Sequence, residues 1–122
     1  MPLRITFIGG EPFCHMRLLE LVNSLNMMNI QVEILTNLSA PLDKIIYALD
    51  CNAIIIASWH GGIDKKNTDF CEKIKMLPKK YFDNNQVDIR IMFENDNWEN
   101  SVQAFKQLVN CCNKDIDINL LS

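Results

Sequence analysis

The alternation of two kinds of segment constrains the fold of this chain more than any other feature. Short apolar runs rich in β-branched residues alternate with amphipathic stretches of helical periodicity. The runs predict strands at residues 3–8, 31–35, 53–57, 87–93 and 116–121. The stretches between them predict helices at residues 14–27, at 42–49, from Asn67 or Thr68 to Leu77, and from Asn100 or Ser101 to Val109 or Cys111. Such alternation predicts an α/β fold with a mostly parallel sheet and right-handed crossovers.

Size and charge narrow the class of protein. A chain of 122 residues suits a single domain, which we expect to span residues 1–122. With a net charge of −3 and no basic run, nucleic acid is not an expected partner. No apolar run approaches the ~20 residues of a membrane span, so no membrane partner is expected either. The five cysteines are scattered and odd in number, which favours free thiols in a cytoplasmic protein.

The segments just after each predicted strand are the candidate binding site, because ligands of parallel sheets bind beyond the carboxyl ends of the strands. The first of them reads Gly9-Gly10-Glu11-Pro12. Two glycines allow a sharp turn and close approach of a ligand. The Glu11 carboxylate can accept a hydrogen bond from a ligand ammonium group. The alternative is a tight turn that carries an exposed acid.

This stretch, placed after a hydrophobic strand and before a helix, resembles the second strand of the radical S-adenosylmethionine (radical SAM) core. In that family the motif contacts the amino group of the methionine moiety. Thr36-Asn37 resembles the end of the family's third strand, and Ser58-Trp59-His60 is similar to the end of the fourth in some members. Segments 70–74 and 89–93 continue the likeness in the same order.

The resemblance implies about five strands of a partial (βα)6 barrel, equivalent to strands 2 to 6 of the core. It implies S-adenosylmethionine as cofactor and a four-iron four-sulfur cluster for the reductive cleavage that starts radical chemistry on a peptide or small metabolite. It designates no catalytic residue here. The cofactor-binding residues that it implies are Gly9, Gly10, Glu11, Pro12, Thr36, Asn37, Ser58 and His60.

One departure from the family concerns the cluster. Its C-x-x-x-C-x-x-C motif precedes Gly-Gly-Glu-Pro, but none of the eight residues before Gly9 is cysteine. Three thiolates are needed to hold such a cluster. The chain is therefore expected to be a fragment, one half of a split enzyme, or a degenerate homologue. A second chain would supply the cluster segment or cover the edge of the first strand.

Two further readings stay open. One is a non-catalytic binding module. The other is a thioredoxin-like or flavodoxin-like protein, in which Cys14 near a helix start would be a reactive thiol. His15 and His60 are weak metal candidates, and the acidic segment 94–99 lacks calcium-loop spacing. No metal site is predicted.

Overall fold

The computed structural model describes residues 3–59, 65–92, 98–111 and 118–121. Its five strands form one parallel sheet in the order β1-β2-β3-β4-β5. The strands are β1 (Arg4–Phe7), β2 (Gln31–Thr36), β3 (Ile54–Trp59), β4 (Val87–Met92) and β5 (Ile118–Leu121). The α/β class and the parallel sheet predicted from the alternation are therefore confirmed, and β1 lies at one edge as expected.

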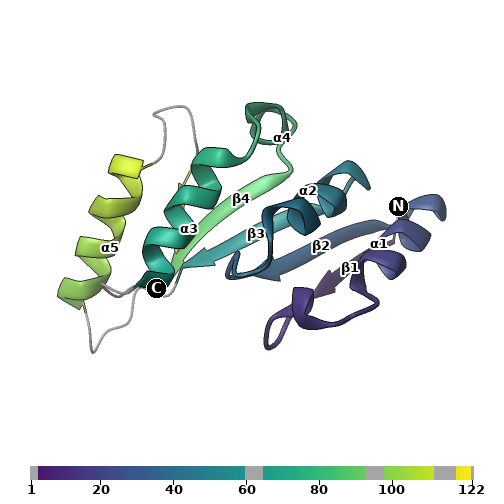
Figure 1. Cartoon of the computed structure of the whole chain (residues 1–122), viewed down its shortest axis with the longest axis horizontal. Helices are drawn as coiled ribbons and strands as arrows, with labels where there is room; N and C mark the ends of the chain where they lie inside the picture. Colours follow the sequence, from purple (N-terminus) through teal and green to yellow (C-terminus); the bar gives the residue numbers. More distant parts are fainter. Residues whose placement is uncertain (1–2, 60–64, 93–97, 112–117, 122) are drawn as a thin grey trace.

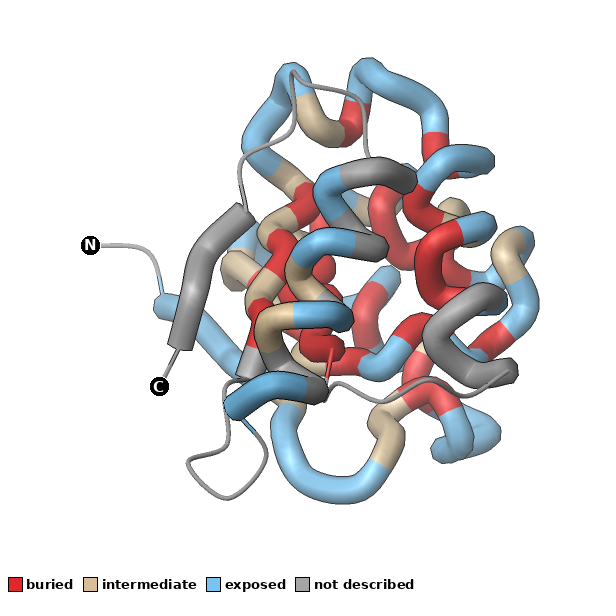
Figure 2. The backbone as a smooth tube through the Cα atoms, turned by 90° about the vertical axis from the view of Figure 1, so that its left-hand side faces the viewer, coloured by how far each residue is buried: buried red, intermediate tan, exposed pale blue. Residues whose placement is uncertain are grey.

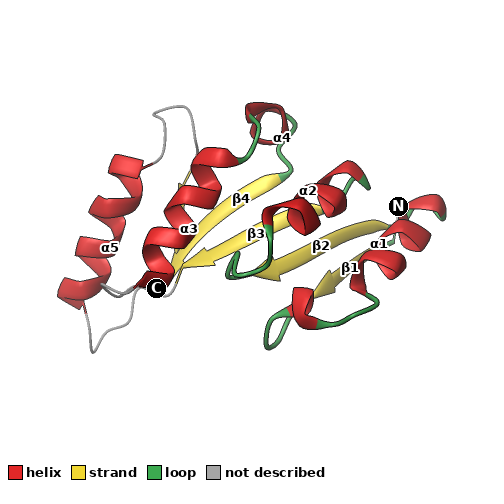
Figure 3. Cartoon of the chain, viewed as in Figure 1, coloured by secondary structure: helices red, strands yellow, loops and turns green. Residues whose placement is uncertain are grey.

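The connections between the strands are helical. They contain the short 3₁₀ helix η1 (Pro12–Cys14) and the helices α1 (Leu18–Met27), α2 (Leu42–Asp50), α3 (Lys65–Met76), α4 (Lys79–Asp83) and α5 (Trp98–Cys111). Figures 1 and 3 show these helices on one face of the sheet. Right-handed crossovers between parallel strands that follow one another in chain order place every helix on the same side.

Several predicted boundaries were wrong. The helix expected from residue 14 begins only at Leu18, because Pro12 starts a 3₁₀ turn and His15 is extended, with a ψ of 124°. α3 and α5 begin earlier than expected, at Lys65 and Trp98. α4 was not predicted; it follows Pro78, which begins a new helix as well as ending the old one. β3 extends two residues further than expected, through Ser58 and Trp59.

The core lies between the sheet and the helices. Alternate residues of the strands point toward the helices, as Val32, Ile34 and Thr36 do in β2. Trp59 belongs to the same set in β3 and stacks on Phe70 of α3, with ring centroids 5.6 Å apart. Figure 2 shows the buried backbone gathered in the interior and the exposed segments around it. Burial of these side chains holds the helices on the sheet.

The same three-residue connection joins three helices to the following strands. Asn29, Asn52 and Asn85 each have a positive φ, of 58°, 65° and 59°. In each case the next N–H donates to the carbonyl five residues back, as Ile30 does to Leu25 at 3.0 Å. This is the Schellman arrangement, in which a left-handed residue ends a helix. Each of these three turns reverses the chain within three residues, so that the next strand begins directly after the helix.

Candidate functional site

The loops after β1 and β2 meet at the carboxyl edge of the sheet, where the sequence places the candidate site. β1 and β2 are adjacent and parallel, with Phe7 beside Ile34, so the segments that follow them leave the sheet side by side. Gly9 and Gly10 both have positive φ, of 86° and 54°, which lets the chain turn back directly after the strand. Pro12 then begins η1 and buries Phe13 beneath the turn. Glu11 is thereby directed toward the end of β2.

Two groups from β2 and its loop bind the Glu11 carboxylate. The Thr36 hydroxyl donates to Oε1 of Glu11, and the Asn37 backbone N–H donates to Oε2 at 3.0 Å. Both donors belong to residues that the sequence analysis singled out. The structure thus joins Glu11, Thr36 and Asn37 into one cluster. A carboxylate held at both oxygens has a defined position before any ligand arrives.

The loop after Thr36 is itself tightly organised. The Leu38 N–H donates to Thr36 Oγ1 at 3.1 Å, and the Ser39 N–H donates to Asn37 Oδ1 at 2.9 Å. Leu38 has a φ of 60°, which is uncommon for leucine, and its side chain is almost completely buried. This backbone conformation is over-determined by the hydrogen bonds on either side of it. The backbone N–H groups of Asn37, Leu38 and Ser39 are thus all used within the protein, and they fix the loop against Glu11.

Lys73 from α3 completes this arrangement and was not predicted. Its Nζ donates to the Leu38 carbonyl at 2.7 Å and lies 3.1 Å from Asp69 Oδ2. Only 14% of the Lys73 side chain is exposed, so the ammonium group is strongly committed to these two partners. The i,i+4 spacing of Asp69 and Lys73 is visible in the sequence, but the bond to Leu38 spans 35 residues and has no local signal.

The remaining predicted residues have different outcomes. Ser58 is the fifth residue of β3 and is buried; its backbone is level with Arg90 of β4. Thr36 is level with Ala57, so Ser58 follows directly along the same edge. The Ser58 side chain points to the face opposite Ala57 and Trp59, which is the helix-free face. His60 lies outside the described residues.

The thiols do not form a site in the described part of the chain. Cys14 is exposed at the end of η1 and not at the start of α1, where the thiol hypothesis required it. Burial and the neighbouring Asp50 raise the pKa of the Cys51 thiol, although a hydrogen bond with Tyr47 acts in the opposite direction. Cys71 is buried. A raised pKa lowers the thiolate fraction of Cys51 at neutral pH, which disfavours nucleophilic chemistry.

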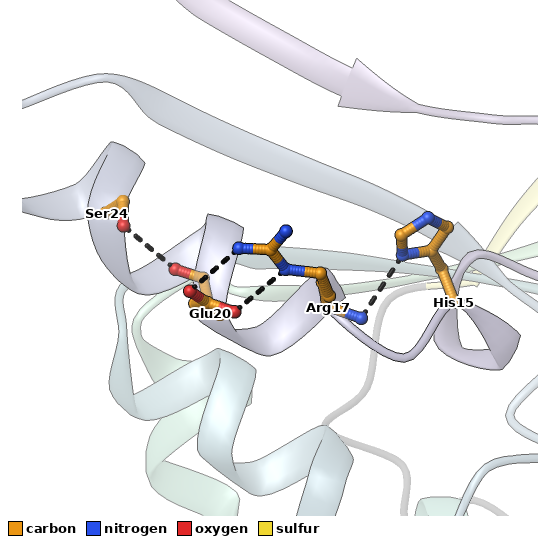
Figure 4. Close-up of polar contacts among 4 residues, drawn as sticks. All are labelled: His15, Arg17, Glu20 and Ser24. Atoms are coloured by element: carbon orange, nitrogen blue, oxygen red, sulfur yellow. Dashed lines mark hydrogen bonds and ion pairs between the residues drawn. The ribbon is translucent and has the colours of Figure 1, made fainter.

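The other histidine has a local structural role. In Figure 4, His15 Nδ1 accepts a hydrogen bond from the Arg17 N–H at 3.2 Å, just before α1 begins. Within the described segments, no three His, Cys, Asp or Glu side chains are grouped as metal ligands. The described residues therefore do not fit a four-iron cluster, whose three thiolates would have to converge.

Comparison with known proteins adds no family: neither protein-family models nor curated proteins match the chain. No helix in the described ranges is long and apolar enough to cross a bilayer.

Proposed function

We propose that the carboxyl edge of the sheet binds S-adenosylmethionine, as part of a radical SAM-like core domain or fragment. The observation that carries the proposal is the fixed Glu11 carboxylate at the meeting point of the β1 and β2 loops. A carboxylate offers about four lone-pair positions. Thr36 and Asn37 use two of them, so two are left for the ammonium group of the methionine moiety.

The fold supports the same proposal. Consecutive parallel strands with helices on one face are the arrangement that a partial (βα)6 barrel requires. A flavodoxin-like sheet instead has the order 2-1-3-4-5, in which the first two strands are exchanged. In the proposed complex Gly9 and Gly10 permit close approach of the ligand: a Cβ built on either glycine has no atom within 4 Å. The Ser58 side chain lies on the opposite face of the sheet from Thr36, so the proposed contact to the ammonium group depends on Glu11.

The residues described here support binding but not reductive cleavage. The four-iron cluster would supply the electron for that step, and this chain lacks the cysteine motif for it. The chain's own residues would hold the methionine moiety and orient it. We therefore assign the cluster segment to another chain or to a further part of the protein. The same residues would also serve a non-catalytic S-adenosylmethionine-binding module.

Calorimetric titration with S-adenosylmethionine tests the site. Without the iron that chelates the ligand in complete enzymes, we expect a Kd no better than roughly 0.1–1 mM, about −4 to −5.5 kcal/mol. Glu11→Gln keeps the shape but removes the charge, and should weaken binding by about 1–2 kcal/mol. Glu72→Gln makes the same change at an exposed position of α3 and should bind like the wild type.

A second ligand separates contact from structure. 5′-Methylthioadenosine lacks the amino-acid group, so its affinity should not change on Glu11→Gln. If Glu11→Gln weakened the binding of both ligands equally, Glu11 would hold the β2 loop in place and would not contact the ligand. No binding of S-adenosylmethionine at millimolar concentration would refute the proposal.

A further inference from the structure

The β1 edge of the sheet has backbone groups directed away from the rest of the molecule. β1 is the first strand in the sheet order, so β2 is its neighbour on one side. The Gln31 N–H donates to the Leu3 carbonyl at 2.9 Å, which places the Leu3 carbonyl on the β2 side. Alternate residues of a parallel strand face the same neighbour. Arg4 and Thr6 therefore direct their N–H and C=O groups outward, where a further strand can pair with them.

Apolar side chains accompany these groups. Leu3, Ile5 and Phe7 form one row on the helix side of β1, and Leu3 and Ile5 are 71% and 37% exposed. Leucine and isoleucine at the edge of a sheet lose contact with water when another strand is added. The edge therefore offers both hydrogen bonds and apolar area to a partner strand.

The flank of α1 continues this surface. Asn23 and Asn26 reach the turn that follows α2, since Asn26 accepts from Asn52 at 3.0 Å and Asn23 accepts from the Cys51 thiol at 3.8 Å. The opposite flank of the helix carries residues at i, i+4, i+7 and i+11 spacing, namely Arg17, Leu21, Ser24 and Met28. Leu21 and Met28 are 44% and 66% exposed. This flank faces the side of the sheet that β1 borders.

We propose that, where no cluster segment occupies this edge, a second copy of this chain docks here, with the two β1 strands paired antiparallel about a twofold axis at Ile5. In this register Arg4 of one copy lies opposite Thr6 of the other, and the two residues exchange both of their outward hydrogen bonds. The twofold axis repeats the exchange, giving four backbone bonds. On the helix side, Ile5 meets Ile5 and Leu3 meets Phe7, so the apolar row continues across the interface.

Charge and sequence disfavour the neighbouring register with its axis at Arg4. An axis at Arg4 would place two guanidinium groups opposite each other and would pair Thr6 with Pro2, which has no N–H to donate. With the axis at Ile5, each Arg4 faces a neutral threonine and keeps its own bond to Glu33, at 3.0 Å.

The two α1 flanks are also self-complementary. The same axis runs them antiparallel, so that the exposed Leu21 and Met28 of each copy face the flank of the other. Figure 4 shows that Glu20 binds Arg17 through two nitrogens, at 3.1 and 3.2 Å. Each Arg17 is thus neutralised within its own copy.

Sedimentation velocity of the full chain at several concentrations tests the proposal, and a closed dimer is expected. Thr6→Pro removes an outward N–H but no bond to β2, so it should shift the protein to monomer and raise the dissociation constant at least tenfold. Thr6→Val keeps the N–H and should remain dimeric. A dimer that persists in Thr6→Pro would refute strand pairing.

A pair of changes on α1 gives an independent test. Leu21→Lys places two ammonium groups at the interface and should also give monomer. Met27→Lys, on the solvent side of the same helix, should leave the dimer unchanged. If circular dichroism shows that Thr6→Pro is unfolded, the comparison of Leu21→Lys with Met27→Lys tests the dimer in its place. A monomeric wild type, or a series of larger oligomers from head-to-tail pairing, would overturn the proposal.

Discussion

Tyr81 is a buried side chain whose protonation the fold controls. Its hydroxyl donates to the Asp50 carboxylate at the end of α2, so α4 is fastened to the neighbouring helix. This hydrogen bond, together with burial and the negative charge of Asp50, raises the pKa of Tyr81. The folded protein therefore retains this proton at a pH where the unfolded chain has released it.

The resulting prediction concerns alkaline pH. A pKa that is higher in the folded state contributes stability below the unfolded value of about 10, and this stability is lost as pH rises through the folded value. Tyr81→Phe should lower the free energy of unfolding by about 1–2 kcal/mol at pH 7 and should flatten its decline above pH ~10. Denaturant unfolding across this range measures both effects.

The control for this measurement is the other tyrosine of the chain. Tyr47 is 45% exposed, so Tyr47→Phe should leave the alkaline decline almost unchanged. An equal decline in the wild type and Tyr81→Phe would contradict the prediction.

The residue scale also marks the limit of sequence reasoning about the site. Parallel topology predicts that Glu11 and Thr36 share an edge, because the carboxyl ends of adjacent strands meet. It does not predict that Thr36 donates to Glu11, since that bond spans 25 residues. Nor does the sequence indicate the positive φ of Leu38, because leucine rarely adopts it.

At the scale of the elements, the helix ends were the hardest boundaries to predict from the sequence. Most strands and helices could be predicted because one of their faces is apolar, and β3 because it is a continuous apolar run that is buried on both faces. The ends of the helices were harder to predict because asparagine, and not glycine, occupies their left-handed positions. Asparagine is also common in ordinary loops. The start of α4 was missed because Pro78 was interpreted only as the end of the preceding helix.

The asparagine turns give a prediction in which two substitutions differ in sign. Asn85 ends α4 with a φ of 59°. Glycine adopts this conformation without a steric penalty, so Asn85→Gly should be neutral or stabilise slightly. Alanine has a Cβ but no polar side chain to compensate, so Asn85→Ala should destabilise by about 1 kcal/mol. Thermal unfolding of the pair measures the difference, and an alanine variant as stable as the glycine variant would rule out the explanation.

For the whole molecule, the parallel sheet was predictable from strict β-α alternation, but the strand order was not, because alternating βα units also form sheets in which the first two strands are exchanged. The edge position of β1 was expected from the resemblance to strands 2 to 6 of the radical SAM core, and the structure has it there. The function was less accessible, because a fold of this kind hosts many chemistries. The likeness to the radical SAM core depends on short motifs, of which the structure joins Glu11, Thr36 and Asn37 by hydrogen bonds.

Iron reconstitution tests the molecule as a whole. Purified anaerobically with iron and sulfide, this chain alone should hold no stable four-iron cluster, because the cysteine triad is absent from its sequence. Iron and sulfide analysis with absorption spectroscopy measures the outcome. Stoichiometric iron together with a charge-transfer band that disappears in Cys14→Ala would show that the remaining thiols can ligate a cluster.

The strand order also bears on how the chain acquires its structure. Every pair of neighbouring strands joins consecutive βα units, so no strand has to wait for a segment far along the chain. During synthesis, β2 can pair with β1 as soon as it emerges, and each later unit adds at the growing edge. Short loop closures favour rapid folding. The sheet therefore has a built-in direction of assembly, from β1 toward β5, that matches the direction of translation.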